Sequence, residues 1–147
     1  PALKHQISAA KVFKVVSRYV DENKLGIVLF APVDLILDSS SILQPDLLFV
    51  SNARQNILTE KGLFSAPDLV IEILSPTTTR NDRITKAQIY ARHKVPAYWI
   101  VDPDQETVEV YLLTVDSYRL AVTLQGEIPL PVPPFTELKL AAKDIFI

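Results

Sequence analysis

A glutamate stands in the middle of an otherwise apolar run, Leu69-Val70-Ile71-Glu72-Ile73-Leu74. The β-branched residues around it favour a strand, and so apolar a run predicts that the strand is buried. A buried carboxylate gives up much of its hydration, which is costly unless the group is paired, protonated or bound to a metal ion. Glu72 is therefore the first candidate for a chemical role. The alternative is an edge strand with an exposed face, where a glutamate needs no partner.

A second carboxylate, Asp46, begins the apolar run that precedes the strand of Glu72 along the chain. Two carboxylates on adjacent strands can approach to about 5 Å. Such a pair predicts a site for Mg²⁺ or Mn²⁺, because a hard cation takes one or two carboxylates and completes its shell with water and substrate phosphate. The alternative for Asp46, which follows Pro45 at a strand start, is a carboxylate that accepts backbone hydrogen bonds.

Two further aspartates are weaker candidates. Asp68 shares the strand face of Glu72, but four residues of strand separate them by roughly 13 Å, so one metal ion cannot use both. It also follows a proline at a strand start, where a structural role is common. Asp34 lies within the extended run 27–37 and is a possible additional site residue.

The elements around Glu72 form a recognisable unit. Ser75-Pro76 ends the strand, Asn81 or Asp82 is predicted to cap a helix that runs to about Lys94, and a second apolar strand covers 98–101. A strand, a helix and a strand in this order predict a crossover with parallel pairing and two covered sheet faces.

The rest of the chain predicts a mixed α/β domain over residues 1–147. A helix is expected from Gln6 or Ser8 to Lys24, with Gly26 as its left-handed C-terminal residue. Residues 51–64 are predicted to form a loop with about one helical turn. Further strands are expected at 27–37, interrupted at Ala31-Pro32, and at 45–50, 107–113 and 118–124. A proline-rich extended arm is expected from about 126, leading to a short segment at 138–147.

Composition limits the function classes. The 147 residues carry a net charge of −2, no cysteine and two histidines, which disfavours disulfides and a usual zinc site. No run is long and apolar enough to span a bilayer, so we expect a cytoplasmic protein without a membrane partner. A nucleic-acid partner would need a local basic surface, for which Arg80 and Arg83 are candidates. The alternative is a solvated helix face.

The pattern PDL…PDLVIEILSP…D…K…YA…VPAYWIVDP resembles the Uma2 family, whose members are grouped with the PD-(D/E)XK restriction-endonuclease-like superfamily. The resemblance implies a restriction-endonuclease-like core, a central mixed β-sheet flanked by helices, and Mg²⁺-dependent hydrolysis of DNA. The superfamily lysine usually stands two residues after the glutamate, where this chain has Leu74. The resemblance therefore implies a migrated lysine, Lys86, although Asp82 and Lys86 could also form a simple surface pair.

The resemblance adds two further expectations. His5 stands where Uma2-like sequences often carry a histidine. Superfamily members commonly form dimers, and in a dimer the proline-rich arm could wrap around the second subunit. Three functions stay open on these grounds. The first is a DNA endonuclease with Asp46, Glu72 and Lys86 in its site. The second is a catalytically silent relative that binds nucleic acid or a protein, and the third is a metal-dependent phosphoesterase with another substrate.

Overall fold

A six-stranded mixed sheet in the order β1-β4-β7-β8-β9-β10 forms the centre of the computed structural model, which describes residues 3–146. β7 and β8 are parallel and joined through helix α2, and every other neighbouring pair is antiparallel. The predicted crossover and the mixed α/β class are thereby confirmed. The bounds are β1 (Gly26–Phe30), β4 (Leu47–Ser51), β7 (Leu69–Ile73), α2 (Arg80–Arg92), β8 (Ala97–Asp102), β9 (Thr107–Leu113) and β10 (Tyr118–Gln125).

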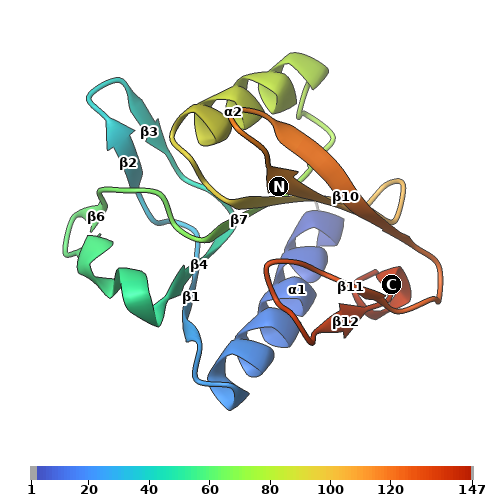
Figure 1. Cartoon of the computed structure of the whole chain (residues 1–147). Coiled ribbons are helices and arrows are strands. Elements are labelled where there is room, and N and C mark those ends of the chain that lie inside the picture. Colours follow the sequence, from blue (N-terminus) through green and yellow to red (C-terminus); the bar gives the residue numbers. More distant parts are fainter. Residues whose placement is uncertain (1–2, 147) are drawn as a thin grey trace.

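Helix α1 (Leu3–Glu22) covers one face of this sheet, and α2 lies on the other (Figure 1). Val12, Val16 and Val20 recur at helical spacing and are fully buried against the sheet. The side chains of β7 divide between the two faces: Leu69, Ile71 and Ile73 belong to the core under α1, and Val70 belongs to the core under α2. Glu72 therefore points to the α2 side.

The proline-rich segment packs on its own chain. It contains β11 (Leu130–Pro131), β12 (Lys139–Leu140) and the short 3-10 helix η2 (Ala142–Asp144), which lie beside α1 in Figure 1. The buried Trp99 donates a hydrogen bond from Nε1 to the Pro133 carbonyl at 2.8 Å, and its ring meets the ring of Phe135. The apolar residues of this segment complete the core of their own chain, and pairing with a second subunit stays a prediction. The last residue of the predicted segment 138–147, Ile147, lies outside the described residues.

A second, smaller sheet in the order β3-β2-β6-β5 stands beside α2. Its strands are β2 (Leu35–Asp38), β3 (Ser41–Leu43), β5 (Leu58–Thr59) and β6 (Gly62–Leu63), and the 3-10 helix η1 (Asn52–Ile57) precedes β5. The predicted extended run 27–37 is thus divided between two sheets, and the predicted loop 51–64 holds a 3-10 helix and two short strands. None of the helices within residues 3–146 combines the length and the apolar character needed to cross a bilayer.

Gly26 has a different role from the predicted one. The left-handed residue after α1 is Lys24, with φ of 53°, and Gly26 already begins β1. A Cβ at Gly26 would stand 2.1 Å from the Val50 carbonyl oxygen of β4. Glycine is therefore required by the close approach of two strands and not by the helix terminus.

Candidate active site

Asp46 and Glu72 face each other across two neighbouring strands. In the antiparallel pairing of β4 with β7, Leu47 is opposite Ile71, so Asp46 stands opposite Glu72 at the next step. The Asp46 backbone N–H donates to Glu72 Oε1 at 3.4 Å. The residues that were predicted to share a metal ion are therefore brought together by strand register.

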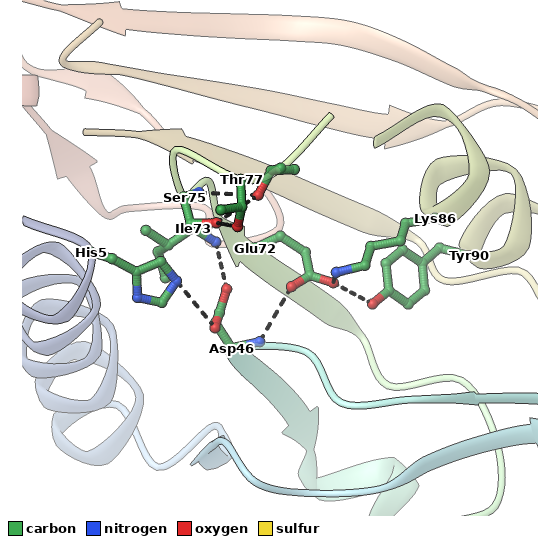
Figure 2. A network of polar contacts seen from close by, with 9 residues as sticks. His5, Asp46, Glu72, Ile73, Ser75, Thr77, Lys86 and Tyr90 are labelled. Carbon is green, nitrogen blue, oxygen red and sulfur yellow. Dashed lines mark hydrogen bonds and ion pairs between the residues drawn. The ribbon is translucent and has the colours of Figure 1, made fainter. Parts of the chain in front are cut away.

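Two side chains of α2 converge on the other oxygen of Glu72 (Figure 2). The hydroxyl of Tyr90 donates to Oε2 at 2.6 Å, and Lys86 Nζ lies 3.5 Å from the same atom. Lys86 and Tyr90 are one helical turn apart, so they share a face of α2. Glu72 itself is only 6% exposed. The buried carboxylate is thus paired and hydrogen-bonded, as its burial requires.

Asp46 is held from two sides as well. Its Oδ2 accepts the backbone N–H of Ile73 at 2.7 Å, which continues the ladder between β4 and β7 past the last backbone pair. Its Oδ1 lies 3.6 Å from Nε2 of His5, which reaches over from α1. Figure 2 shows Asp46 between His5 and Glu72, so the site joins the N-terminal helix, the central strands and α2.

Burial raises the pKa of Glu72 above its ordinary value of 4.5. The Lys86 ammonium and the hydrogen bond from Tyr90 act in the opposite direction, and the nearby Asp46 carboxylate raises the pKa further. Desolvation is the largest of these effects. A cation placed beside Glu72 would favour its ionised form, so proton and cation compete for this carboxylate.

The raised pKa predicts that, without divalent ions, Glu72 destabilises the fold increasingly as pH rises above 4.5. The folded protein holds this proton more tightly than the unfolded chain, so between the ordinary and the raised pKa the free energy of unfolding falls with pH. Urea unfolding in EDTA across this pH range, compared between the parent and Glu72→Gln, isolates the contribution of Glu72. We expect the parent to lose stability relative to the variant as pH rises. A constant difference between the two proteins would contradict the shift.

The donor set fits a hard divalent cation. Glu72 Oε2 already takes two partners. Among the described residues, Oε1 has only the long contact with the Asp46 N–H, and Asp46 Oδ1 has only the imidazole of His5 nearby. One oxygen of each acid is therefore available. Within residues 3–146, no three or more residues among His, Cys, Asp and Glu are grouped so as to hold a metal ion. Two carboxylates suit Mg²⁺, which retains waters and takes phosphate oxygens from a substrate.

A hydroxyl-rich turn links Glu72 to α2. The Thr78 Oγ1 atom accepts the Ser75 backbone N–H at 3.1 Å, and Ser75 Oγ lies 3.1 Å from Thr77 Oγ1. The N-cap of α2 is Thr79, whose hydroxyl accepts the backbone N–H of Asp82 while the Asp82 carboxylate accepts that of Thr79. The prediction that Asn81 or Asp82 is the N-cap is therefore wrong, because the cap lies at Thr79 and Asp82 is the N3 residue of the capping box.

Removing this cap is expected to lower the free energy of unfolding by about 1 kcal/mol in Thr79→Ala. The matched control is Thr85→Ala, because Thr85 is exposed in the middle of α2 and its side chain makes no hydrogen bond within residues 3–146. Alanine is the better helix former there, so the control should not lose stability. Urea unfolding of the two variants measures the difference, and equal losses would argue against the capping role.

Some of the sequence candidates lie elsewhere. Asp68 accepts the backbone N–H of Ser51 at 2.6 Å at the far end of β7, and Asp34 accepts a hydrogen bond from Gln44 at 2.8 Å. Neither makes a hydrogen bond or ion pair with Asp46 or Glu72 among the described residues. Arg80 and Arg83 stand in the first turn of α2, and both line a cleft on its sheet-facing side.

Tyr90 is a site residue that the sequence analysis did not single out. It is fully buried, and its hydroxyl makes the shortest hydrogen bond to Glu72. The usable signal was its spacing of four residues from Lys86, which places both side chains on one helix face. Leu74, at the usual lysine position, is half-buried and packs against the same cluster as Tyr90.

Comparisons with known proteins agree with the fold and with the family resemblance of the sequence. A family model described as "Uma2: Putative restriction endonuclease" matches residues 1–143. The fold is similar to the crystal structure of "a putative nuclease belonging to DUF820 from Anabaena variabilis ATCC 29413", with a TM-score of 0.80 and 24% identity over 99% of this chain and 81% of that one. No curated protein matches the chain. Because the family model spans nearly the whole sequence, the chain belongs to the Uma2 family.

Proposed function

We propose that this protein is an endonuclease that hydrolyses DNA phosphodiester bonds with the help of a divalent metal ion. The observation that carries the proposal is the convergence of Asp46, Glu72 and Lys86 in one partly buried site. Asp46 directly precedes β4, Glu72 lies on β7 and Lys86 lies on α2. Two acids and a lysine are the residue types that metal-assisted phosphoryl chemistry needs, and the family description names the same class of activity.

In this proposal Asp46 and Glu72 hold Mg²⁺ or Mn²⁺ through the oxygens that lack strong protein partners. When bound, the ion makes water a better nucleophile near neutral pH and offsets negative charge on the phosphate oxygens. Tyr90 and the Ile73 N–H fix the orientations of the two carboxylates, and His5 restricts Asp46 from the side of α1. These neighbours hold the acids in place before substrate arrives, so less reorganisation is needed at the reaction step.

Lys86 has a separate task. Hydrolysis forms a bond from water oxygen to phosphorus, breaks the bond to the leaving oxygen and gives that oxygen a proton. The Lys86 ammonium is half-exposed on one side and lies 3.5 Å from Glu72 on the other, so it can donate a hydrogen bond to the attacking water or to a phosphate oxygen. It thereby stabilises the charge that builds up on the phosphate, and it favours the ionised form of Glu72.

The polyanionic substrate needs a local counter-charge because the chain as a whole has a net charge of −2. Arg80 and Arg83 precede Lys86 on α2 and supply that charge beside the site, where the helix also carries Arg92 and a single acid, Asp82. Phosphate contacts of this kind weaken as salt rises. The substrate should therefore be cleaved best at low salt.

The test is cleavage of supercoiled plasmid and of single-stranded DNA at low salt, in Mg²⁺, in Mn²⁺ and in EDTA. Nicked or shortened products with either ion, and none in EDTA, are expected. Absence of cleavage by a folded protein with both ions would overturn the proposal. That outcome would instead favour a catalytically silent relative, consistent with Leu74 at the usual lysine position.

A further inference from the structure

A cleft of about 410 Å³ opens beside the site, between α2 and the strands β8, β9 and β10. Its lining is mainly apolar and aromatic, with Tyr98, Tyr111 and Tyr118 on the sheet side and Arg80 and Arg83 on the helix side. The ring of Tyr98 lies 5.4 Å from that of Tyr118 and 6.3 Å from that of Tyr111, centre to centre. The volume of the cleft falls in the range of small-ligand sites.

The cleft lies next to Glu72 on the same face of the sheet. Glu72 pairs with Ile100 on β8, and Ile100 pairs with Glu109 on β9, so the three form one row across the strands. Ile100 and Glu109 line the cleft, and two strand spacings place Glu109 about 10 Å from Glu72. If the phosphate of a nucleotide lies at Glu72, the base of that nucleotide can therefore reach the cleft.

One tyrosine that lines the cleft has a hydroxyl without a hydrogen-bond partner among the described residues. Tyr98 is 2% exposed and lines the cleft, yet its hydroxyl makes no hydrogen bond to any residue within 3–146. The neighbouring tyrosines behave differently: Tyr90 donates to Glu72, and Tyr118 donates to the Val95 carbonyl at 2.7 Å. Buried tyrosine hydroxyls usually find a partner. A ligand with a polar edge would supply one here.

Charges of both signs line the cleft, with two arginines on the helix side and the acids Glu109 and Asp116 on the side of β9 and the turn after it. Arg80 and Arg83 bring positive charge that suits a phosphate. Glu109 brings a carboxylate to the sheet side, which can accept a hydrogen bond from an exocyclic amino group of a base. The tyrosine rings between them offer flat apolar surface on which a base can stack. Cation, aromatic surface and acceptor together match a nucleotide.

We propose that this cleft binds an unpaired nucleobase of the strand whose phosphate lies at Glu72, so that the substrate is single-stranded or locally unpaired DNA. The inference rests on the proposed nuclease function for the position of that phosphate. A base in a duplex is stacked on both faces and paired along its edge, so it must be extruded at an energetic cost before it can enter such a pocket. A single strand offers the base without that cost.

The test uses the parent protein in EDTA, so that binding is measured without cleavage. A short fluorescein-labelled oligonucleotide is titrated as a single strand and again after annealing to its complement, with fluorescence anisotropy as the readout. The single strand should bind at least about tenfold more tightly than the duplex, and Tyr111→Ala should weaken single-strand binding by about tenfold through loss of stacking. Arg83→Ala removes an arginine of the cleft. Its matched control, Arg18→Ala, removes an exposed arginine of α1 on the opposite face of the sheet.

Tyr98→Phe keeps the ring and removes only the hydroxyl, so it tests the cleft with little risk to folding. It should also weaken single-strand binding, and duplex binding should stay as in the parent. Equal affinity for the two DNA forms, or variants of the cleft that bind like Arg18→Ala, would overturn the inference. Cleft-dependent binding without any DNA cleavage would support base binding by the cleft and overturn the nuclease proposal. Cleavage without a preference for single strands would support the nuclease proposal and overturn base binding by the cleft.

Discussion

Glu72→Gln is expected to lower the rate of metal-dependent DNA cleavage at least about a thousandfold, because a metal-assisted step draws several kcal/mol from the ion. Glutamine keeps the shape of the side chain and can still accept the hydrogen bond from Tyr90. It lacks the negative charge that a divalent ion requires. The rate of plasmid nicking in Mg²⁺ measures the loss, and isothermal titration with Mn²⁺ shows whether the ion still binds.

The fold should not suffer from this change. Glu72 is a buried carboxylate whose desolvation is its largest unfavourable effect, so a neutral isostere should leave the free energy of unfolding unchanged or higher. The matched control is Asp34→Asn, because Asp34 accepts a hydrogen bond from Gln44 and makes none with the site acids within residues 3–146. This control should cleave at the parental rate. Full activity in Glu72→Gln, or loss in Asp34→Asn, would contradict the assignment of the site.

The pairing of Asp46 with Glu72 could be predicted because both residues break a strong local pattern. A carboxylate inside a β-branched run is costly to bury, and the aspartate at the start of the preceding run stands opposite it, one step past the Leu47–Ile71 pair. The crossover through α2 was predictable for a similar reason, since a helix between two buried strands leaves few alternatives. Strong local patterns in the two strands thus gave the correct part of the prediction.

The missed features depend on contacts between distant segments. Whether residues 27–37 form one strand or two is decided by which sheet each half joins, and the chain near Pro32 reads as extended in both cases. The docking of the proline-rich segment depends on the hydrogen bond from Trp99 to Pro133, 34 residues away. The hydroxyl of Tyr90 finds Glu72 only once α2 is packed on the sheet. Local sequence patterns do not contain this information.

Lys86→Met is expected to reduce cleavage about a hundredfold, the size of effect seen when one well-placed donor to a developing charge is removed. It should leave an ion-binding site in place, since Asp46 and Glu72 are intact. Lys86 also lowers the pKa of Glu72, so its removal raises that pKa further and the remaining activity should need a higher pH. The rate of nicking as a function of pH separates this variant from one that merely disturbs packing.

The control for Lys86→Met is Arg92→Met, which removes one positive charge from an exposed position on the same helix. It should lower cleavage slightly at low salt through weaker DNA attraction, and it should leave the pH dependence unchanged. If both variants lose the same activity, Lys86 acts only through general charge and its assignment as the migrated lysine is wrong.

A second lysine position allows a sharper test. Leu74 is half-buried, follows Glu72 by two residues and therefore points to the same side of β7. In the double variant Leu74→Lys with Lys86→Met, the ammonium returns to the position that the superfamily normally uses. Recovery of about tenfold over Lys86→Met is expected, because the charge is restored beside Glu72 but without the geometry that α2 provides. No recovery in a folded double variant would mean that the site depends on a donor from α2, and that strand β7 alone cannot supply the charge where the phosphate needs it.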